Sequence, residues 1–250
     1  MERVPTGIKE FDELIEGGFP KGSIVLLTGV PGSGKTIFCL QVAKNFAERG
    51  KKVLYLNIDG ETAEGLALQA EMLGMDIKEL IKKKRLIIQR VKDLKNFKKE
   101  IKNYVKSGVS MIVLDSLSGA LPSLYNPKEV EKYLLFQETT VMGVLDPNFA
   151  LRIIISEIFD FFRELKLDIA FVVTDKVEGQ EGLSRDAISE FIADGIIDFE
   201  TLGIAGAFNR TIKILKLRKT DHHKEPVTFE IGKGGIIITK EEIEKVAKEF

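Results

Sequence analysis

One stretch near the N-terminus, Ile24 to Gln41, constrains the fold more than any other part of this chain of 250 residues. Its apolar run Ile24–Leu27 has the composition of a buried parallel strand. The next residues, GVPGSGKT at positions 29–36, match the pattern G-x-x-x-x-G-K-[ST] at every fixed position. The apolar spacing from Ile37 to Phe46 then predicts a buried helix. A strand, a glycine-rich loop and a helix in this order predict a phosphate-binding loop in an α/β fold.

The residue types in this loop suit a nucleoside triphosphate such as ATP. Glycines lack a Cβ atom, so the backbone N–H groups can approach phosphate oxygens closely. The helix that begins at Lys35 adds the unpaired N–H groups and the positive dipole end of its first turn. Lys35 is placed to reach the β- and γ-phosphates, and the Thr36 hydroxyl is placed to bind Mg²⁺. We expect the nucleotide to be bound by Gly29, Val30, Pro31, Gly32, Ser33, Gly34, Lys35, Thr36 and Ile37.

The remainder of the chain first alternates strands with helices and then changes to hairpins. We predict strands at 53–58, 85–91, 110–115 and 169–174, with helices at 63–73, 77–83, 94–105 and 150–165. The tail predicts four antiparallel strands, at 196–202, 211–218, 227–231 and 236–239, and a helix from Lys240. This order predicts one α/β domain over residues 1–250, with a mostly parallel sheet flanked by helices and a C-terminal antiparallel extension. Three prolines interrupt residues 119–148, where we assign only a short helix at 130–136.

Composition excludes several classes of protein. The formal net charge is -1, which gives no overall attraction to nucleic acid or to anionic membranes. The only cysteine, Cys39, falls on the predicted buried helix, so no disulfide forms within the chain and a cytoplasmic location is expected. We find neither the apolar core of a signal peptide nor an apolar run long enough to span a bilayer.

Hydrolysis needs more carboxylates than the loop contains. Asp115 ends an apolar strand, which is the usual place of the carboxylate on the Mg²⁺ side of such a site. Asp59 and Glu61 follow the strand after the loop helix, at the sheet edge where open α/β folds bind ligands. Either carboxylate could orient the attacking water, and a solvated acidic turn is the alternative for both.

Taken together, these residues resemble the KaiC-like branch of the RecA superfamily of ATPases over nearly the whole chain. The motifs that carry the resemblance are Thr6–Ile8 with Phe11–Leu14 and Gly17–Gly18, the Walker A loop 29–36, the Walker B strand Val113–Ser116, and Ile214–Thr220 with His222. The resemblance implies a RecA-like P-loop NTPase core and a homo-oligomeric ring, commonly a hexamer, with ATP bound between neighbours. It favours Glu61 over Asp59 as the residue that positions water. Thr174, after the next strand, matches the position of a polar sensor of the γ-phosphate.

The resemblance also implies that Lys216 and Arg218 act across the subunit interface on the γ-phosphate of the adjacent copy. Cations two residues apart on a strand share one face and could stabilise transition-state charge, although solvated strand charges are the alternative. This chain departs from the family pattern in three ways. Gly60 and Glu61 stand where paired glutamates are common, Lys219 replaces a glycine, and KaiC itself is a tandem of two such domains. A circadian or autokinase role is therefore not implied.

These residues are compatible with three hypotheses about function. The first is an oligomeric Mg²⁺-dependent ATPase that drives a protein partner or a ring rearrangement. The second is a recombination or repair accessory protein with ATP-dependent DNA binding, although the loop 176–186 has mixed charge and no aromatic side chain to stack on a base. The lysine-rich region 78–106 is compatible with a phosphate-rich partner, but a solvated helix face explains it better. The third is a nucleotide-gated scaffold with little turnover. A P-loop kinase is less favoured, since no acceptor pocket or arginine-rich lid is evident.

Overall fold

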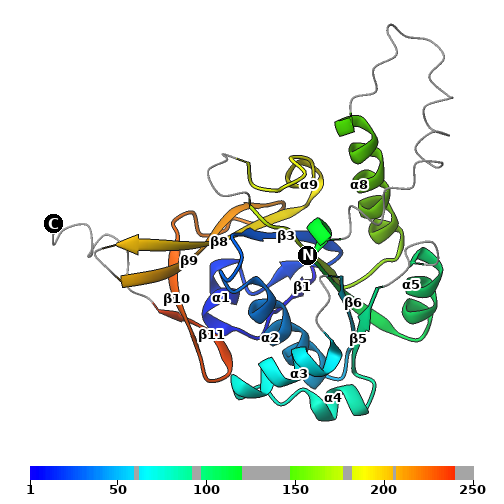
Figure 1. Ribbon diagram of the computed structural model, residues 1–250, viewed down its shortest axis with the longest axis horizontal. Helices are drawn as coiled ribbons and strands as arrows, with labels where there is room; N and C mark the ends of the chain where they lie inside the picture. Colours follow the sequence, from blue (N-terminus) through cyan, green and yellow to red (C-terminus); the bar gives the residue numbers. More distant parts are fainter. Residues whose placement is uncertain (59–61, 92–96, 120–146, 177–181, 205–206, 240–250) are drawn as a thin grey trace, which may run out of the picture.

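A computed structural model describes the chain except for residues 59–61, 92–96, 120–146, 177–181, 205–206 and 240–250 (Figure 1). Its strands are β1 (Arg3–Val4), β2 (Phe19–Pro20), β3 (Ser23–Gly29), β4 (Lys52–Asn57), β5 (Leu86–Arg90), β6 (Val109–Asp115), β7 (Ile169–Val173), β8 (Gly195–Ile204), β9 (Ala207–Leu217), β10 (Val227–Gly232) and β11 (Gly235–Thr239). Its helices are α1 (Lys9–Leu14), α2 (Lys35–Glu48), α3 (Ala63–Met72), α4 (Lys78–Lys82), α5 (Phe97–Lys106), α8 (Pro147–Glu164) and α9 (Ser189–Ile192).

A single large sheet organises the described residues, with strand order β11-β10-β9-β8-β3-β7-β6-β4-β5. The strands from β8 to β5 run parallel to one another. Strands β9, β10 and β11 continue the sheet as antiparallel neighbours. The predicted fold class, a mostly parallel sheet with a C-terminal antiparallel extension, is confirmed.

Helices cover both faces of the sheet and create two apolar cores. Residues of α1, α2, α3 and α4 pack in the first core, and residues of α5, α8 and α9 pack in the second. The parallel strands are apolar on both faces because each face is covered by helices. This two-sided cover agrees with the continuous apolar runs that predicted the strands.

An aromatic cluster fixes α2 against the sheet. The Phe38 ring lies between the rings of Phe11, Phe171 and Phe199, at centroid distances of 5.1, 5.9 and 5.5 Å. Phe38 itself is fully buried. Because α2 begins directly after the glycine-rich loop, this packing also fixes the position of that loop.

The first tail strand differs from the prediction. We predicted four antiparallel strands, but β8 lies beside β3 and runs parallel to it, with Val25 opposite Gly195 and Gly29 opposite Phe199. Parallel neighbours need a long crossover, and the segment between β7 and β8, which contains α9, supplies it. The short helix α9 was not predicted.

Other sequence predictions can be placed only in part. The unassigned region 120–146 and the helix predicted from Lys240 lie outside the described residues. Cys39 is buried on α2 as predicted, and burial raises the pKa of its thiol well above the ordinary value. In the described part of the chain, no helix has the length and apolar character needed to cross a membrane.

Candidate nucleotide-binding site

The glycine-rich loop lies where β3 ends and α2 begins, at the carboxyl edge of the parallel strands. Gly34 is the N-cap of α2 and has a left-handed backbone, with φ of 109°. A Cβ atom at Gly29 would lie 2.2 Å from the carbonyl oxygen of Phe199, so only glycine fits there. The first turn of α2 contains no acidic residue, which leaves its N–H groups and positive dipole end available to an anion.

The Lys35 ammonium group is held close to the loop. Its Nζ donates to the carbonyl oxygens of Gly29 and Val30, at 2.8 and 3.0 Å. It also lies 3.1 Å from Oδ1 of Asp175, which follows β7. The Lys35 side chain is only 7% exposed. The ammonium group is therefore already at the loop, where a polyphosphate would be bound.

The two residues predicted to bind a metal are in direct contact. Thr36 Oγ1 donates to Oδ2 of Asp115 at 2.9 Å, across 79 positions of sequence. The hydroxyl of Tyr55, on β4, donates to the same oxygen at 2.5 Å. Tyr55 is fully buried and Asp115 is 8% exposed. The structure thus brings a hydroxyl and a fixed carboxylate together beside the loop.

These residues fit Mg²⁺ of the kind bound together with a nucleotide. Mg²⁺ prefers oxygen donors and is commonly held by one or two protein groups plus substrate phosphates. Within the described ranges, no group of three or more His, Cys, Asp or Glu side chains forms an independent metal cluster. Thr36 and Asp115 supply the hard oxygen donors, so the donor set agrees with a metal shared with phosphate.

The residues after β7 connect three parts of the site. Thr174 is fully buried, and its Oγ1 lies 3.2 Å from Oγ of Ser118, which follows the Walker B strand β6. The next residue, Asp175, contacts Lys35. Lys176 then donates to Asp198 of β8 at 2.5 Å and lies 3.5 Å from Glu200. This arrangement arises because β7 lies between β3 and β6 in the sheet.

Asp198 is a buried carboxylate next to the loop. It is opposite Thr28 in the register of β8 and β3. Burial raises the pKa of Asp198 to about 6; Lys176 opposes this shift, and Glu200 adds to it. Asp198 therefore retains a proton in the folded chain at a higher pH than an ordinary aspartate does.

Lys216 and Arg218 lie at the end of β9, level with the middle and the first half of β3 and not with the loop at its carboxyl end. Lys216 is opposite Ile196, which is level with Leu26 of β3. Its Nζ donates to the carbonyl oxygens of Glu190 and Phe191 at 3.2 and 3.3 Å, and Arg218 donates to Asp194 at 3.1 Å. Burial, together with the Arg218 charge, lowers the pKa of Lys216.

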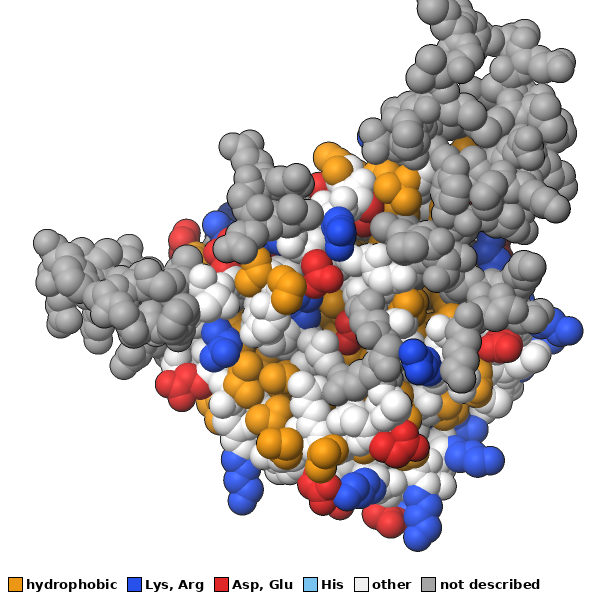
Figure 2. Space-filling model, viewed as in Figure 1, with side chains coloured by type: hydrophobic (Ala, Val, Ile, Leu, Met, Phe, Trp, Pro, Cys, Tyr) orange, Lys and Arg blue, Asp and Glu red, His pale blue; other side chains and the backbone are white. Residues whose placement is uncertain are grey.

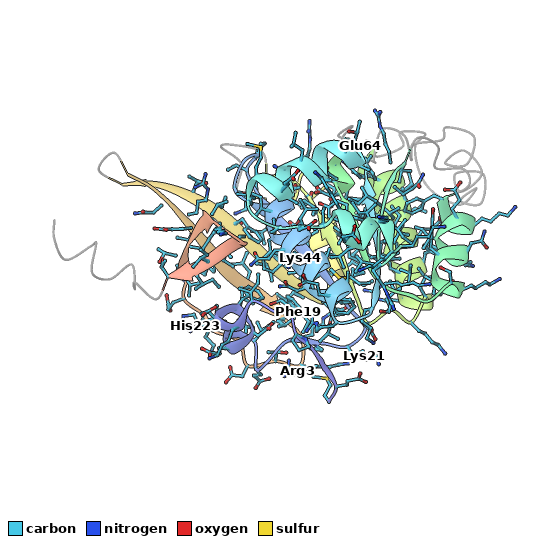
Figure 3. All side chains as sticks on the ribbon, turned by 90° about the horizontal axis from the view of Figure 1, so that it is seen from below. Arg3, Phe19, Lys21, Lys44, Glu64 and His223 are labelled. Carbon is cyan, nitrogen blue, oxygen red and sulfur yellow. The ribbon has the colours of Figure 1, made fainter. Side chains whose placement is uncertain are left out.

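The first and last motifs of the resemblance are linked through residues beside them. Arg3 donates to Oγ1 of Thr220 at 2.6 Å, and the backbone N–H of His223 donates to the carbonyl of Leu14 at 2.9 Å. Figure 3 shows Arg3 and His223 on the side of the molecule opposite Glu64, which stands at the start of α3. The N-terminal signature and the residues after β9 therefore form one contact region, away from the start of α3.

Some site predictions cannot be placed and some contacts were not foreseen. Asp59 and Glu61 lie outside the described residues. Asp175 was missed although it follows a buried strand, the same signal that identified Asp115. Tyr55 was missed because one tyrosine within an apolar strand carries no local signal of a hydroxyl turned toward a carboxylate.

Comparison with known proteins agrees with the resemblance to KaiC-like ATPases. The family described as "ATPase: KaiC" matches residues 4–243. A crystal structure of a KaiC-like protein from the hyperthermophilic archaeon Pyrococcus horikoshii OT3 superimposes with a TM-score of 0.78. The two sequences are 30% identical, and the superposition covers 95% of this chain and 99% of the archaeal chain.

Two named relatives differ in length. The circadian clock oscillator protein KaiC of Prochlorococcus marinus (strain CCMP1986) is 28% identical over 244 residues, covering 95% of this chain and 45% of the clock protein. This chain thus spans about half the length of the clock protein. A UPF0273 protein of Thermotoga maritima is 26% identical and is covered over 96% of its length.

Proposed function

The chain belongs to the KaiC ATPase family, and from this membership we propose that it binds ATP with Mg²⁺ and hydrolyses it in a site that a neighbouring copy completes. ATP binding by a RecA-type P-loop core is the part that family membership supports directly. The binding of Mg²⁺, the hydrolysis of ATP and the completion of the site by a neighbouring copy are proposed in addition to what family membership supports. The protein partner that would use the energy is left unassigned.

One observation carries the proposal: Lys35, Thr36 and Asp115 converge at the end of β3. The backbone of residues 29–36 and the first turn of α2 provide N–H groups for the phosphates. Lys35 provides a positive charge for the β- and γ-phosphates. Thr36 and Asp115 would hold Mg²⁺, which when bound neutralises charge on the phosphate oxygens. These are the groups that a phosphoryl-transfer site needs for positioning and charge stabilisation.

Water activation is assigned to Glu61, with Asp59 as the alternative. Both residues follow β4, whose Asn57 is level with Asp115 in the register of β4 and β6. A carboxylate at this edge could accept the proton of a water molecule placed in line with the γ-phosphate. This role comes from the family resemblance and is the first target of mutagenesis.

The register of the sheet supports a role in trans for Lys216 and Arg218. Lys216 is level with Leu26, three residues before Gly29, so it lies roughly 10 Å short of the loop along the strand direction. Its ammonium group donates to two backbone carbonyls of α9. This placement supports the proposal that the two cations contact the γ-phosphate bound by an adjacent copy, as in a ring.

Calorimetric titration of the full chain with ATP and Mg²⁺ tests nucleotide binding. We expect Lys35→Ala to weaken binding by about 10- to 100-fold, the scale of a lost hydrogen bond between charged groups. Lys44→Ala is the matched control, because Lys44 lies on the same helix and pairs with exposed Glu48 (Figure 3). The proposal is wrong if the wild type binds no nucleotide, or if Lys35→Ala binds ATP as tightly as the wild type does.

Phosphate release tests hydrolysis. We expect Glu61→Gln to lose most of the turnover while retaining ATP binding, because the amide cannot accept a proton. Glu64→Gln, at an exposed position at the start of α3, is the control. Equal rates for the wild type and Glu61→Gln would favour the nucleotide-gated scaffold instead.

Size-exclusion chromatography with light scattering, with and without ATP and Mg²⁺, tests the neighbouring copy. We expect a homo-oligomer, with a hexamer as the family resemblance implies. A monomer under every condition would remove the trans role of Lys216 and Arg218.

The DNA-binding alternative gains no support from the described side chains. Lys176 is held by Asp198 and Glu200, so this cation of the predicted loop is already paired. On the face that Figure 2 shows, basic and acidic side chains are interspersed along the lower rim. Anisotropy with single-stranded DNA at two salt concentrations would detect ATP-dependent binding if it exists.

A further inference from the structure

Asp175 contacts the key cation of the site without belonging to the glycine-rich loop or to the Walker B strand. It follows Thr174 at the end of β7, and its Oδ1 lies 3.1 Å from Lys35 Nζ. The Asp175 side chain is 31% exposed, whereas that of Lys35 is 7% exposed. The carboxylate therefore approaches the ammonium group from the solvent side.

The Lys35 ammonium group has three N–H donors and three acceptors within 3.1 Å. Two acceptors are the backbone carbonyls of Gly29 and Val30, which are part of the loop. The third acceptor is the carboxylate of Asp175. A phosphate oxygen that receives a hydrogen bond from Lys35 must replace one of the three. Asp175 is the acceptor most easily displaced, because it is a partly exposed side chain and its negative charge repels phosphate.

The backbone around Asp175 is held in place, so the exchange must occur at the side chain. The N–H of Asp175 donates to Oγ of Ser118 at 3.1 Å. On either side, the N–H of Thr174 donates to the Leu27 carbonyl at 2.9 Å, and that of Lys176 donates to the Gly29 carbonyl at 3.1 Å. These bonds tie residues 174–176 to β3 and to Ser118. Rotation of the Asp175 side chain would release Lys35 without moving the sheet.

We propose that Asp175 competes with the nucleotide polyphosphate for the Lys35 ammonium group and so acts as a positioning residue that sets nucleotide affinity. This inference rests on the proposed ATP site. In the absence of phosphate, Asp175 keeps the buried ammonium group paired and directed into the loop. On binding, the β- and γ-phosphates take the place of the carboxylate at Lys35 Nζ.

Titration calorimetry with MgADP and MgATP tests the proposal on the full chain. We expect Asp175→Asn to bind both nucleotides about tenfold more tightly than the wild type, the scale of one charge-assisted hydrogen bond removed from the competition. A residue with a merely structural role would leave affinity unchanged or weaken it when replaced. An unchanged or lower affinity in Asp175→Asn would therefore overturn the proposal.

Two further variants make the test specific. Glu200→Gln removes the same charge from a nearby carboxylate that pairs with Lys176 and not with Lys35. Its affinity should stay within about twofold of the wild type; an equal gain would mean that general charge repulsion, and not competition for Lys35, is responsible. Asp175→Ser replaces Asp175→Asn if the latter fails to fold. If the wild type binds no nucleotide, the proposed function fails; if it binds and the Asp175 variants gain nothing, only this inference fails.

Discussion

Replacing Tyr55 by Phe would remove a single hydroxyl group that contacts Asp115. The Tyr55 ring is fully buried in β4, so the ring of Phe would occupy the same space. The lost hydrogen bond is 2.5 Å long and ends on the carboxylate oxygen that also accepts from Thr36. Its acceptor is therefore a group that we assign to Mg²⁺ binding.

The expected cost follows from the charge on the acceptor. Hydrogen bonds to charged groups contribute roughly 1.5–3 kcal/mol, so Tyr55→Phe should lower the free energy of unfolding by about 2 kcal/mol. For a chain of this size, that loss corresponds to a fall of about 4–8 °C in the unfolding midpoint. Groups that orient a metal ligand change metal affinity by about 10- to 100-fold when removed. We expect the apparent Mg²⁺ affinity of the nucleotide complex to fall by about tenfold.

The assay is nucleotide binding measured over a series of Mg²⁺ concentrations, together with thermal unfolding. Tyr104→Phe is the matched control, because the Tyr104 hydroxyl is 3.5 Å from the neutral Gln89 side chain, away from the loop. Tyr104→Phe should leave the Mg²⁺ dependence of nucleotide binding unchanged. It should shift the midpoint of thermal unfolding by no more than about one degree. A Tyr55→Phe variant with the Mg²⁺ dependence of the wild type would refute the view that Tyr55 orients Asp115.

Two further predictions concern the loop and the carboxylate beside it. Gly29→Ala should lower the free energy of unfolding by several kcal/mol and abolish nucleotide binding, because the added Cβ atom would lie 2.2 Å from the Phe199 carbonyl oxygen. Gly22→Ala is the control: Gly22 has a φ of +84° but open space around it, so this substitution should lower the free energy of unfolding by only about 1 kcal/mol. Burial raises the pKa of Asp198 to about 6, above the unfolded value of about 3.9. The unfolded chain thus releases this proton first, and the stability of the wild type should fall relative to Asp198→Asn as pH rises from about 4 to 6. Urea unfolding at both pH values measures the difference, and a constant difference would contradict the assignment.

Local patterns in the sequence were enough to predict the family and most of the elements. The match over residues 4–243 confirms the resemblance read from the loop 29–36 and the strand that ends at Asp115. Both signals are local, since each consists of an apolar strand followed directly by residues of a particular chemistry. The sequence also predicted that Thr36 and Asp115 both lie on the Mg²⁺ side of the site, and the structure places the two side chains in contact.

Only the tertiary structure decided which other side chains reach the site. The insertion of β7 between β3 and β6 brings Asp175 to Lys35, and the pairing of β4 with β6 brings Tyr55 to Asp115. It also decided that β8 runs parallel to β3, which places Asp198 beside the loop. The physical reason is that hydrophobic periodicity specifies which residues are buried in each strand, whereas contacts between strands depend on their order and direction in the sheet.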